Sequence, residues 1–252
     1  MSDSIHRVNH QIRQRRLVVL RVTELTPRMR RITLGGAELA GFSSLGTDDH
    51  IKLLFATTAE QQQAIDAREL NRDGARPTMR EYTPRRIDLV NLELDIDFVL
   101  HGDGPASTWA AQATPGQTLN IAGPRASLVV PDIFDSYLLI GDETAIPAIA
   151  RRLEALPAGR RVVAVIQIED DQERQVLASQ AQVEVTWVLR HQQDLLQVVS
   201  GLSLPQGRLY SWVALEKSLT RQAKALLLDK GVQEDALKAA AYWRAEGTAD
   251  DD

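Results

Sequence analysis

The chain has 252 residues, of which 44% are hydrophobic and 25% are charged, a composition typical of a globular protein large enough for two domains. It contains no cysteine, which excludes disulfides, a thiolate nucleophile and a cysteine-ligated iron–sulfur cluster, so a redox function would need a bound organic cofactor. The formal net charge of −5 makes duplex nucleic acid a poor candidate partner, and we expect no nucleic-acid function.

The N-terminal stretch and the histidines add two further exclusions. The start of the chain is polar and lacks the apolar core of a secretory signal, and no apolar run is long enough to span a membrane. We therefore expect a cytoplasmic protein, with a monomer as the default state. Only His6 and His10 have the i, i+4 spacing of a helical metal site, and they lie in a basic stretch, so no metal site is expected.

The first half of the chain has the pattern of antiparallel β-structure. Its strand-like segments are separated by clusters of glycine, proline and aspartate, and the polar segment 57–77 is expected to form a helix or loop between strands. The six predicted strands are 17–23, 29–34, 50–56, 79–87, 92–100 and 117–122. Short strands at this spacing predict an antiparallel six-stranded β-barrel, which we assign to residues 1–131.

Arginines are concentrated near the start of this half. They alternate with apolar residues such as Leu17, Val19 and Ile32, so we interpret them as the solvated faces of strands. These arginines are Arg13, Arg15, Arg16, Arg21, Arg28, Arg30 and Arg31.

The second half alternates strands with helices. Strands are predicted at 137–140, 161–168, 183–189 and 207–214, and helices at 146–156, 194–202 and 218–230. This order predicts a doubly wound parallel α/β domain, which we assign to residues 136–252. The alanines of segment 238–242 favour a helix. A β-barrel followed by such a sheet resembles the construction of ferredoxin-reductase-like flavoenzymes, in which the barrel holds the flavin and the sheet faces a nicotinamide nucleotide.

The first motif that carries chemistry is the run 80–85, with the sequence REYTPR. On a strand, Arg80 and Tyr82 share a face, and Thr83 points the other way. An arginine fork suits a diphosphate, a tyrosine offers a flat surface to an isoalloxazine ring, and a threonine hydroxyl can bond a flavin ring atom. A packed tyrosine beside a salt-bridged arginine explains this run equally well when it is taken alone.

The second motif, HGDGPASTWA at residues 101–110, directly follows a strand in which apolar and polar residues alternate. Gly102 and Gly104 allow a tight turn and the close approach of a ligand. Pro105 suits the first turn of a helix, where the free N–H groups of Ala106 and Ser107 form an anion site. A capped strand-to-helix turn is the alternative. The two motifs lie about one strand apart, and this combination favours a flavin diphosphate site.

Together these motifs resemble the siderophore-interacting protein family of FAD-binding ferric-siderophore reductases. The resemblance is carried by REYTPR, LDIDFVLHGDGPASTWA and PGQTLNIAGPRAS between residues 80 and 127. DDHIKLLF at 48–55, GDETAIPA at 141–148 and YWR at 242–244 extend it over nearly the whole chain. For segment 238–242, the resemblance implies a strand where the alanines favour a helix.

The resemblance also implies roles for individual residues. FAD would be held by Arg80, Tyr82 and Thr83, its pocket lined by Asp97, Val99 and His101, and its diphosphate contacted by Ala106 and Ser107. The turn facing NADPH or NADH would be Gly141, Asp142, Glu143, Thr144 and Ala145, and the substrate residues would be Lys52 and Arg244. Two cations near the flavin suit a ferric siderophore, because ferric catecholate chelates are multiply anionic.

The activity implied by the resemblance is transfer of electrons from NAD(P)H through FAD to Fe(III) in a ferric siderophore. Reduction releases the metal, because ferrous iron binds siderophores far more weakly than ferric iron. Outer-sphere electron transfer needs no acid, base or metal ligand from the protein, so we expect no catalytic residue. Two alternatives stay open: another ferredoxin or flavin reductase of the same superfamily, and a non-catalytic siderophore carrier.

One segment departs from the family pattern. The sequence ALE at 214–216 stands where relatives typically have Ala-Gly-Glu, and the bulk of Leu215 is expected near the nucleotide. Arg174 and Arg190 lie near strand ends where a 2′-phosphate could sit, whereas Glu169 and Asp170 argue against a phosphate there. The sequence therefore leaves the choice between NADPH and NADH open.

Overall fold

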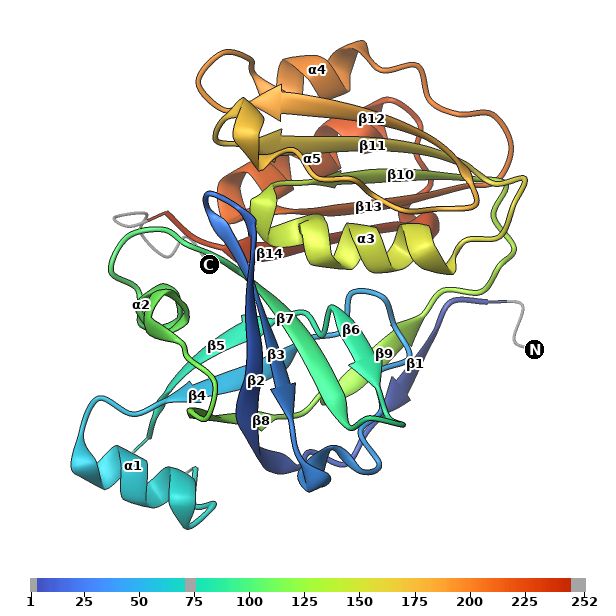
Figure 1. The fold of residues 1–252 in the computed structure, drawn as a ribbon. Helices are drawn as coiled ribbons and strands as arrows, with labels where there is room; N and C mark the ends of the chain where they lie inside the picture. The colour runs from blue at the N-terminus through green and yellow to red at the C-terminus, as the bar shows by residue number, and fades with distance from the viewer. Residues whose placement is uncertain (1–3, 71–75, 246–252) are drawn as a thin grey trace. The chain divides into compact units, whose positions relative to one another are not determined.

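The computed structural model describes residues 4–70 and 76–245, and its chain forms two compact units, one ending at Val130 and the other beginning at Pro131 (Figure 1). The strands of the N-terminal unit are β1 (His6–Asn9), β2 (Gln14–Thr26), β3 (Met29–Gly35), β4 (Ile51–Phe55), β5 (Thr78–Tyr82), β6 (Arg86–Asp88), β7 (Glu93–Val99), β8 (Thr118–Ala122) and β9 (Ala126–Val129). Its helices are η1 (Ala37–Leu39), α1 (Ala59–Asp66) and α2 (Pro105–Gln112).

Seven of these strands form one antiparallel sheet, in the order β5-β4-β8-β2-β3-β7-β6. β1 pairs separately with β9, also antiparallel. Three of the six neighbouring pairs join strands that are not consecutive in the chain: β4 with β8, β2 with β8, and β3 with β7. The sheet therefore brings the strand that carries the REYTPR run and the strand that precedes the HGDGPASTWA run into one unit.

The sheet differs from the predicted six-stranded barrel in its strand count. The predicted strand 79–87 is two strands, because Thr83, Pro84 and Arg85 interrupt it. Pro84 has no N–H to give to a ladder, and the Arg85 N–H donates to the Asp95 carbonyl on β7 (2.8 Å). The chain thus passes from one edge strand, β5, to the other edge strand, β6. No ladder joins these two edges in the described part of the chain.

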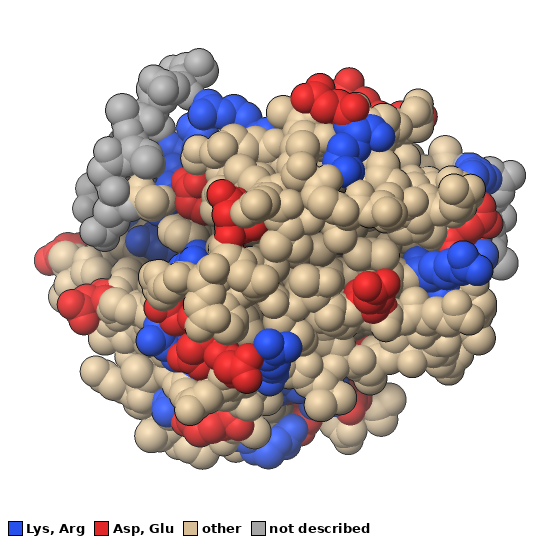
Figure 2. All heavy atoms as spheres, turned by 90° about the horizontal axis from the view of Figure 1, so that it is seen from above, with Lys and Arg blue, Asp and Glu red and all other residues tan. Residues whose placement is uncertain are grey.

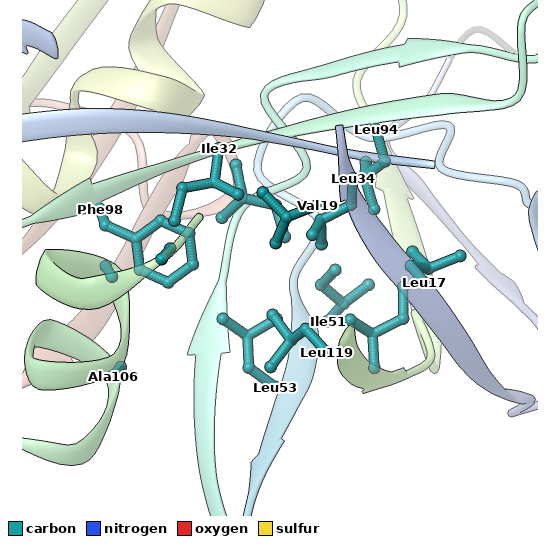
Figure 3. Packing of buried hydrophobic residues seen from close by; sticks show 14 of the residues in the cluster. Leu17, Val19, Ile32, Leu34, Ile51, Leu53, Leu94, Phe98, Ala106 and Leu119 are labelled. Carbon is teal, nitrogen blue, oxygen red and sulfur yellow. The ribbon is translucent and has the colours of Figure 1, made fainter. Parts of the chain in front are cut away.

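The core of the N-terminal unit follows from period-2 alternation along the strands. Leu17 and Val19 alternate with exposed residues on β2, and their side chains are almost fully buried. Figure 3 shows these side chains pointing toward those of the facing strands, with Ala106 of α2 on the same side as Phe98. Because α2 packs against β3, β4 and β7, it covers the apolar face of the sheet at this end.

The C-terminal unit is a five-stranded parallel sheet with the order β12-β11-β10-β13-β14. Its strands are β10 (Ser136–Gly141), β11 (Arg161–Ile168), β12 (Gln182–Leu189), β13 (Leu209–Glu216) and β14 (Leu237–Trp243). Its helices are η2 (Glu143–Ala145), α3 (Ile146–Ala155), η3 (Asp171–Glu173), α4 (Leu195–Gly201), α5 (Lys217–Asp229) and η4 (Glu234–Ala236). Helices α4 and α5 pack on one face, against side chains such as Leu138 and Ile140, and α3 lies on the other (Figure 1).

The alanine-rich segment 238–242 belongs to strand β14, so the helix that its alanines favour is wrong and the strand implied by the family resemblance is right. β14 pairs in parallel with β13, and Leu237 and Ala239 pack against the core beneath α4 and α5. Helix propensity is a weak preference that ladder hydrogen bonds and burial override here.

Leu215 is also placed differently from the prediction. Its side chain is fully buried in the core formed with α4 and α5, instead of standing near the nucleotide at the strand end. Side chains alternate between the two faces of a strand, and Leu215 points to the face covered by α4 and α5, together with Val213.

Two surface properties bear on possible partners. In the described residues, no helix is long and apolar enough to cross a membrane. On the face shown in Figure 2, basic and acidic side chains are interspersed and do not gather by sign. This face therefore carries no basic stripe of the kind by which proteins bind nucleic acid.

Leu215→Ala should lower the free energy of unfolding by about 2–5 kcal/mol, because it leaves a cavity at a fully buried position. Chemical denaturation measures the loss, and Leu209→Ala on the same strand, where the leucine is only half-buried, should cost less. If Leu215→Ala left the stability unchanged and bound the nucleotide more tightly, the side chain of Leu215 would lie near the nucleotide and obstruct it, and the buried position would be wrong.

Candidate functional site

Arg80 and Tyr82 lie on the inward face of edge strand β5. In the ladder with β4, Arg80 is opposite Leu53 and Tyr82 is opposite Ile51, and both partners are fully buried core residues. Directly opposed residues share a face, so Arg80 and Tyr82 share the face that α2 covers on β4. The Arg80 side chain is exposed, and its Nη1 donates to the Met79 carbonyl oxygen (2.9 Å).

Aromatic contacts bring the two motifs together at this face. The Tyr82 ring lies 4.6 Å from the Phe98 ring, and the Phe98 ring lies 5.6 Å from the indole of Trp109 on α2, measured between centroids. Burial raises the pKa of Tyr82 to about 12, so its side chain stays a neutral phenol at physiological pH. The two predicted flavin motifs therefore meet through Phe98, which the sequence pattern marks only as an apolar position of an alternating strand.

The turn that enters α2 has the features of an anion site. Gly102 has a φ of +49°, which favours glycine, and a Cβ at either Gly102 or Gly104 would meet no heavy atom within 4 Å. Gly104 is the N-cap residue of α2 and supplies no side chain to it, while Pro105 occupies the first turn. The Ser107 hydroxyl accepts from the His101 N–H (2.9 Å) and so holds the turn closed.

This donor set fits the diphosphate of FAD. An exposed guanidinium and the first-turn N–H groups of an eight-residue helix both donate to phosphate oxygens, and the open space at the two glycines admits a bulky anion. The neutral Tyr82 ring adds a flat surface on the same face.

The predicted pocket-lining residues on β7 and after it have different surroundings. Val99 is half-buried and His101 is exposed. Asp97 is only 4% exposed, and Arg31 binds both of its carboxylate oxygens, at 2.6 and 2.8 Å. Arg85 approaches the same carboxylate at 3.9 Å. Asp97 is thus already fully engaged by two arginines, while Ala106 and Ser107 are buried in the first turn of α2.

The arginines predicted to form solvated strand faces are in part structural. Arg21 binds Glu93 through two hydrogen bonds (2.7 and 2.9 Å), and Arg15 is only 5% exposed and donates to the Glu38 carbonyl (2.9 Å). The buried Arg15 therefore contradicts the interpretation of these side chains as solvated, whereas Arg21 is exposed even though it is paired. Pairing across strands is invisible in a linear pattern, because Arg21 and Glu93 are 72 residues apart.

Lys52 is on the opposite face of β4 from the core. It lies opposite Glu81 in the ladder, and its Nζ is 3.9 Å from Glu81 Oε1. His50 Nε2 lies 3.8 Å from the other oxygen of the same carboxylate. All three side chains are about half exposed, so the cluster is open to solvent. The buried Thr83 follows Tyr82 in the segment that leaves β5.

In the C-terminal unit, the predicted turn 141–145 follows β10 directly. A Cβ on Gly141 would lie 2.4 Å from the Ala145 Cβ, so glycine is needed there for the tight turn into α3. Asp142 is almost fully buried and accepts from the Thr144 N–H (2.9 Å), the Thr144 hydroxyl (2.5 Å) and the Trp243 indole N–H (2.7 Å). Burial raises the pKa of Asp142 above its ordinary value.

The next residue of this turn, Glu143, has a different partner. Its Oε2 accepts from Arg190 Nη2 (2.5 Å), and burial raises the pKa of Glu143. Arg190 also donates to Gln167 Oε1 (3.0 Å) and lies 3.3 Å from Glu169. Arg190 is therefore held by acidic and amide side chains, and Arg174, the other arginine considered for a 2′-phosphate, donates to Asp171 Oδ1 (2.7 Å). Beside it is a cavity of about 370 Å³ at the ends of β11 and β12, lined by Glu169, Asp170, Asp171, Gln172, Leu189, His191 and Gln192.

Asp142, Trp243 and Glu216 mark the ends of three neighbouring strands. The strand order reverses at β10, because the chain moves from β10 to β11 and β12 and then returns to β13 on the other side. In open α/β sheets, ligands bind outside the carboxyl ends of strands at such a reversal. The sequence pattern indicated no individual role for Trp243 or Glu216. For Glu216, a signal is its acidic side chain directly before a helix, where the helix dipole favours negative charge.

Lys52 belongs to the N-terminal unit and Arg244 to the C-terminal unit. Arg244 is exposed and directly follows Trp243, whose indole is fixed by Asp142. Each of these two predicted substrate residues is thus exposed within its own unit, Lys52 beside Glu81 and Arg244 directly after Trp243.

Comparisons with known proteins agree with this architecture. Residues 18–128 match the siderophore-interacting FAD-binding domain, and residues 134–246 match the siderophore-interacting protein family. An NADPH-dependent ferric-chelate reductase of Escherichia coli is 36% identical, covering 95% of this chain and 96% of the relative. The ferric vibriobactin reductase ViuB of Vibrio cholerae is 29% identical, covering 97% of this chain and 93% of the relative.

Solved structures give the same result. A siderophore utilization protein from T. fusca superimposes with a TM-score of 0.87 at 33% identity, covering 99% of each chain. Phthalate dioxygenase reductase superimposes with a TM-score of 0.63 at 11% identity, over 90% of this chain and 68% of that protein, which shows the fold alone. The architecture is that of the ferredoxin-reductase-like class, an antiparallel flavin-type unit followed by a parallel α/β unit. Within this class, the chain belongs to the siderophore-interacting protein family.

Arg80→Ala should reduce FAD retention roughly tenfold or more, the loss expected when a charge-assisted hydrogen bond to phosphate is removed. The ratio of visible flavin absorbance to protein absorbance after gel filtration measures the effect. Arg13→Ala is the matched control, because this exposed guanidinium in the same unit bonds Gln11 (3.1 Å). Full flavin content in Arg80→Ala would mean that the diphosphate binds elsewhere.

Proposed function

We propose that this protein is an FAD-dependent reductase that transfers electrons from NAD(P)H to Fe(III) in ferric siderophores and so releases Fe(II). The observation that carries the proposal is the meeting of Arg80, Tyr82 and the α2 N-terminus on one face of a unit that matches the siderophore-interacting FAD-binding domain. The names of the E. coli and V. cholerae relatives, a ferric-chelate reductase and a ferric vibriobactin reductase, support the same activity.

The residues of the N-terminal unit would bind and orient the flavin. Arg80 and the N–H groups at Ala106 and Ser107 would hold the diphosphate, and Tyr82 would lie beside the ring system, with Thr83 offering a hydroxyl at its edge. When bound, FAD accepts a hydride and gives up single electrons. The protein then has to position the cofactor and the chelate, and no side chain needs to act as an acid or base.

The turn 141–145 and the neighbouring strand ends would face the nicotinamide nucleotide, because they lie at the reversal of strand order. NADPH is the donor supported by the name of the E. coli relative. The acidic cavity at the end of β11 favours NADH as a second candidate, because carboxylates accept from ribose hydroxyls and repel a 2′-phosphate.

Lys52 and Arg244 would attract the anionic chelate, since both are exposed cations that the family resemblance places at the substrate. Glu81 opposes this attraction at Lys52, because its carboxylate lies 3.9 Å from the ammonium nitrogen and repels an anion. The attraction of an anion to Lys52 therefore depends on both the ammonium group of Lys52 and the carboxylate of Glu81.

The activity is tested with the purified holoprotein under argon. NADPH should bleach the visible flavin absorbance, and a ferric siderophore should restore it while a ferrous-specific dye traps Fe(II). Restoration by a ferredoxin or free flavin alone would favour another reductase of the superfamily. A colourless protein that takes up no FAD would favour a siderophore carrier.

Charge variants should change the apparent KM for an anionic ferric siderophore in opposite directions. Lys52→Ala and Arg244→Ala should each raise KM roughly two- to fivefold, the size expected for exposed charge pairs, whereas Glu81→Gln should lower it. FAD content should stay unchanged in all three variants. Steady-state kinetics at several salt concentrations measures the effect, which should weaken as the Debye length falls below about 10 Å.

A matched control for Lys52 is Lys224→Ala, which breaks another exposed pair, with Glu234 (3.0 Å), in the C-terminal unit. It should leave KM unchanged, and a neutral ferric chelate should be insensitive to every variant. Unaltered KM values in the Lys52 and Arg244 variants, or loss of flavin from them, would show that the substrate binds elsewhere.

A further inference from the structure

One oxygen of the Glu216 carboxylate is buried without a hydrogen-bond partner. Glu216 ends β13, is only 7% exposed and caps α5: its Oε2 accepts from the Ser218 N–H (2.6 Å) and the Leu219 N–H (3.2 Å). Among the residues that the structure describes, nothing donates to Oε1. Buried acceptors are almost always paired, and an unpaired carboxylate oxygen is especially costly, so this atom indicates a missing donor.

The position of Glu216 indicates where that donor comes from. Glu216 is in register with Trp243 at the end of β14, and its strand neighbours β10 on the other side. These are the carboxyl ends of strands at the reversal of strand order, the place where such sheets bind ligands. The nearby Asp142 is already fully paired with Thr144 and Trp243, so Glu216 offers the unpaired acceptor at this edge.

The direction of a bound dinucleotide follows from the same topology. In doubly wound sheets the pyrophosphate lies at the turn after the first strand, here β10, and the adenosine ribose lies near the end of the second, here β11. The nicotinamide half then extends the other way, toward β13. On that half, the carboxamide is the group whose nitrogen donates hydrogen bonds while the ring is being reduced or oxidised.

We propose that Glu216 Oε1 accepts a hydrogen bond from the carboxamide NH₂ of the nicotinamide nucleotide. The inference rests on the proposed use of NAD(P)H and adds a residue that recognises the nicotinamide end of this nucleotide. Glu216 is a binding residue that fixes the ring by its substituent, while its other oxygen, by capping α5, holds the carboxylate in place. Leu215 can replace a glycine beside it without obstructing this contact, because the leucine side chain points into the core.

The test compares nucleotides that differ in a single donor, by isothermal titration calorimetry on the oxidised holoprotein. NADP⁺ carries the carboxamide, its 3-acetylpyridine analogue has a methyl ketone with no N–H, and 2′,5′-ADP has no nicotinamide. Wild-type protein should bind NADP⁺ roughly tenfold more tightly than the analogue, as expected for a hydrogen bond to a charged acceptor. Glu216→Gln retains an oxygen to cap α5 but places an NH₂ at the open position, so this preference should disappear.

Asp194→Asn is the matched control, because Asp194 caps α4 in the same way, accepting from the Leu196 and Gln197 N–H groups (2.8 and 3.2 Å). It should keep the preference for NADP⁺, and 2′,5′-ADP should bind both variants as it binds the wild type. Equal affinity of the wild type for NADP⁺ and the analogue overturns the inference, whether or not Glu216→Gln folds. Failure of the wild type to bind any of the three nucleotides would instead overturn the proposed use of NADPH.

Discussion

The ring of Phe98 lies in contact with two aromatic side chains that come from different motifs. Tyr82 reaches it from β5 and Trp109 reaches it from α2, with centroid distances of 4.6 and 5.6 Å. Because Phe98 is fully buried, its position is fixed by the core of the unit, and it fixes in turn the spacing between the REYTPR strand and the N-terminus of α2. A diphosphate bound by both depends on this spacing, since hydrogen bonds weaken steeply with small errors in geometry.

The opposite face of β7, the strand that carries Phe98, is stabilised by ion pairs. Glu93, Asp95 and Asp97 alternate with apolar residues along β7, and arginines from β2, β3 and β6 approach them. Two hydrogen-bonding arginines lower the pKa of Glu93 to about 2, so its carboxylate stays ionised at physiological pH. A strand with a polar face can thus be buried on both sides, because arginines of neighbouring strands pair with its acids.

At the carboxyl edge of the parallel sheet, hydrogen bonding separates acids that are paired within the protein from an acid with an open oxygen. Asp142 and Glu143 are buried with their hydrogen bonds supplied by the protein, and they tie β10 to β14 and β12. Glu216 is buried with one oxygen satisfied and the other open. Residue type alone does not distinguish these three acids, since the difference lies in which donors the fold brings near each oxygen.

The sequence pattern predicted the antiparallel character of the first unit and the parallel α/β character of the second, and it singled out the two motifs that meet at Phe98. Period-2 alternation in segments such as 92–100 and helical spacing in 146–156 follow directly from burial of one face, and β11 coincides with the predicted strand at 161–168. Gly102 and Pro105 signal a turn into a helix, because the φ of +49° at Gly102 favours glycine and proline suits the first turn of a helix. The strand at 238–242 was recoverable only from family resemblance, since alanine propensity favours a helix.

Tertiary structure decided which polar groups are still available for a ligand. The split of 79–87 into two edge strands, the pairing of Arg31 with Asp97 and the burial of Leu215 all depend on residues distant in sequence. The unpaired Oε1 of Glu216 also depends on the tertiary structure, because an oxygen is unpaired only when no donor from any part of the fold lies near it. Local pattern fixes which face of a strand or helix is apolar, whereas the pairing of each polar atom is set only when the strands meet.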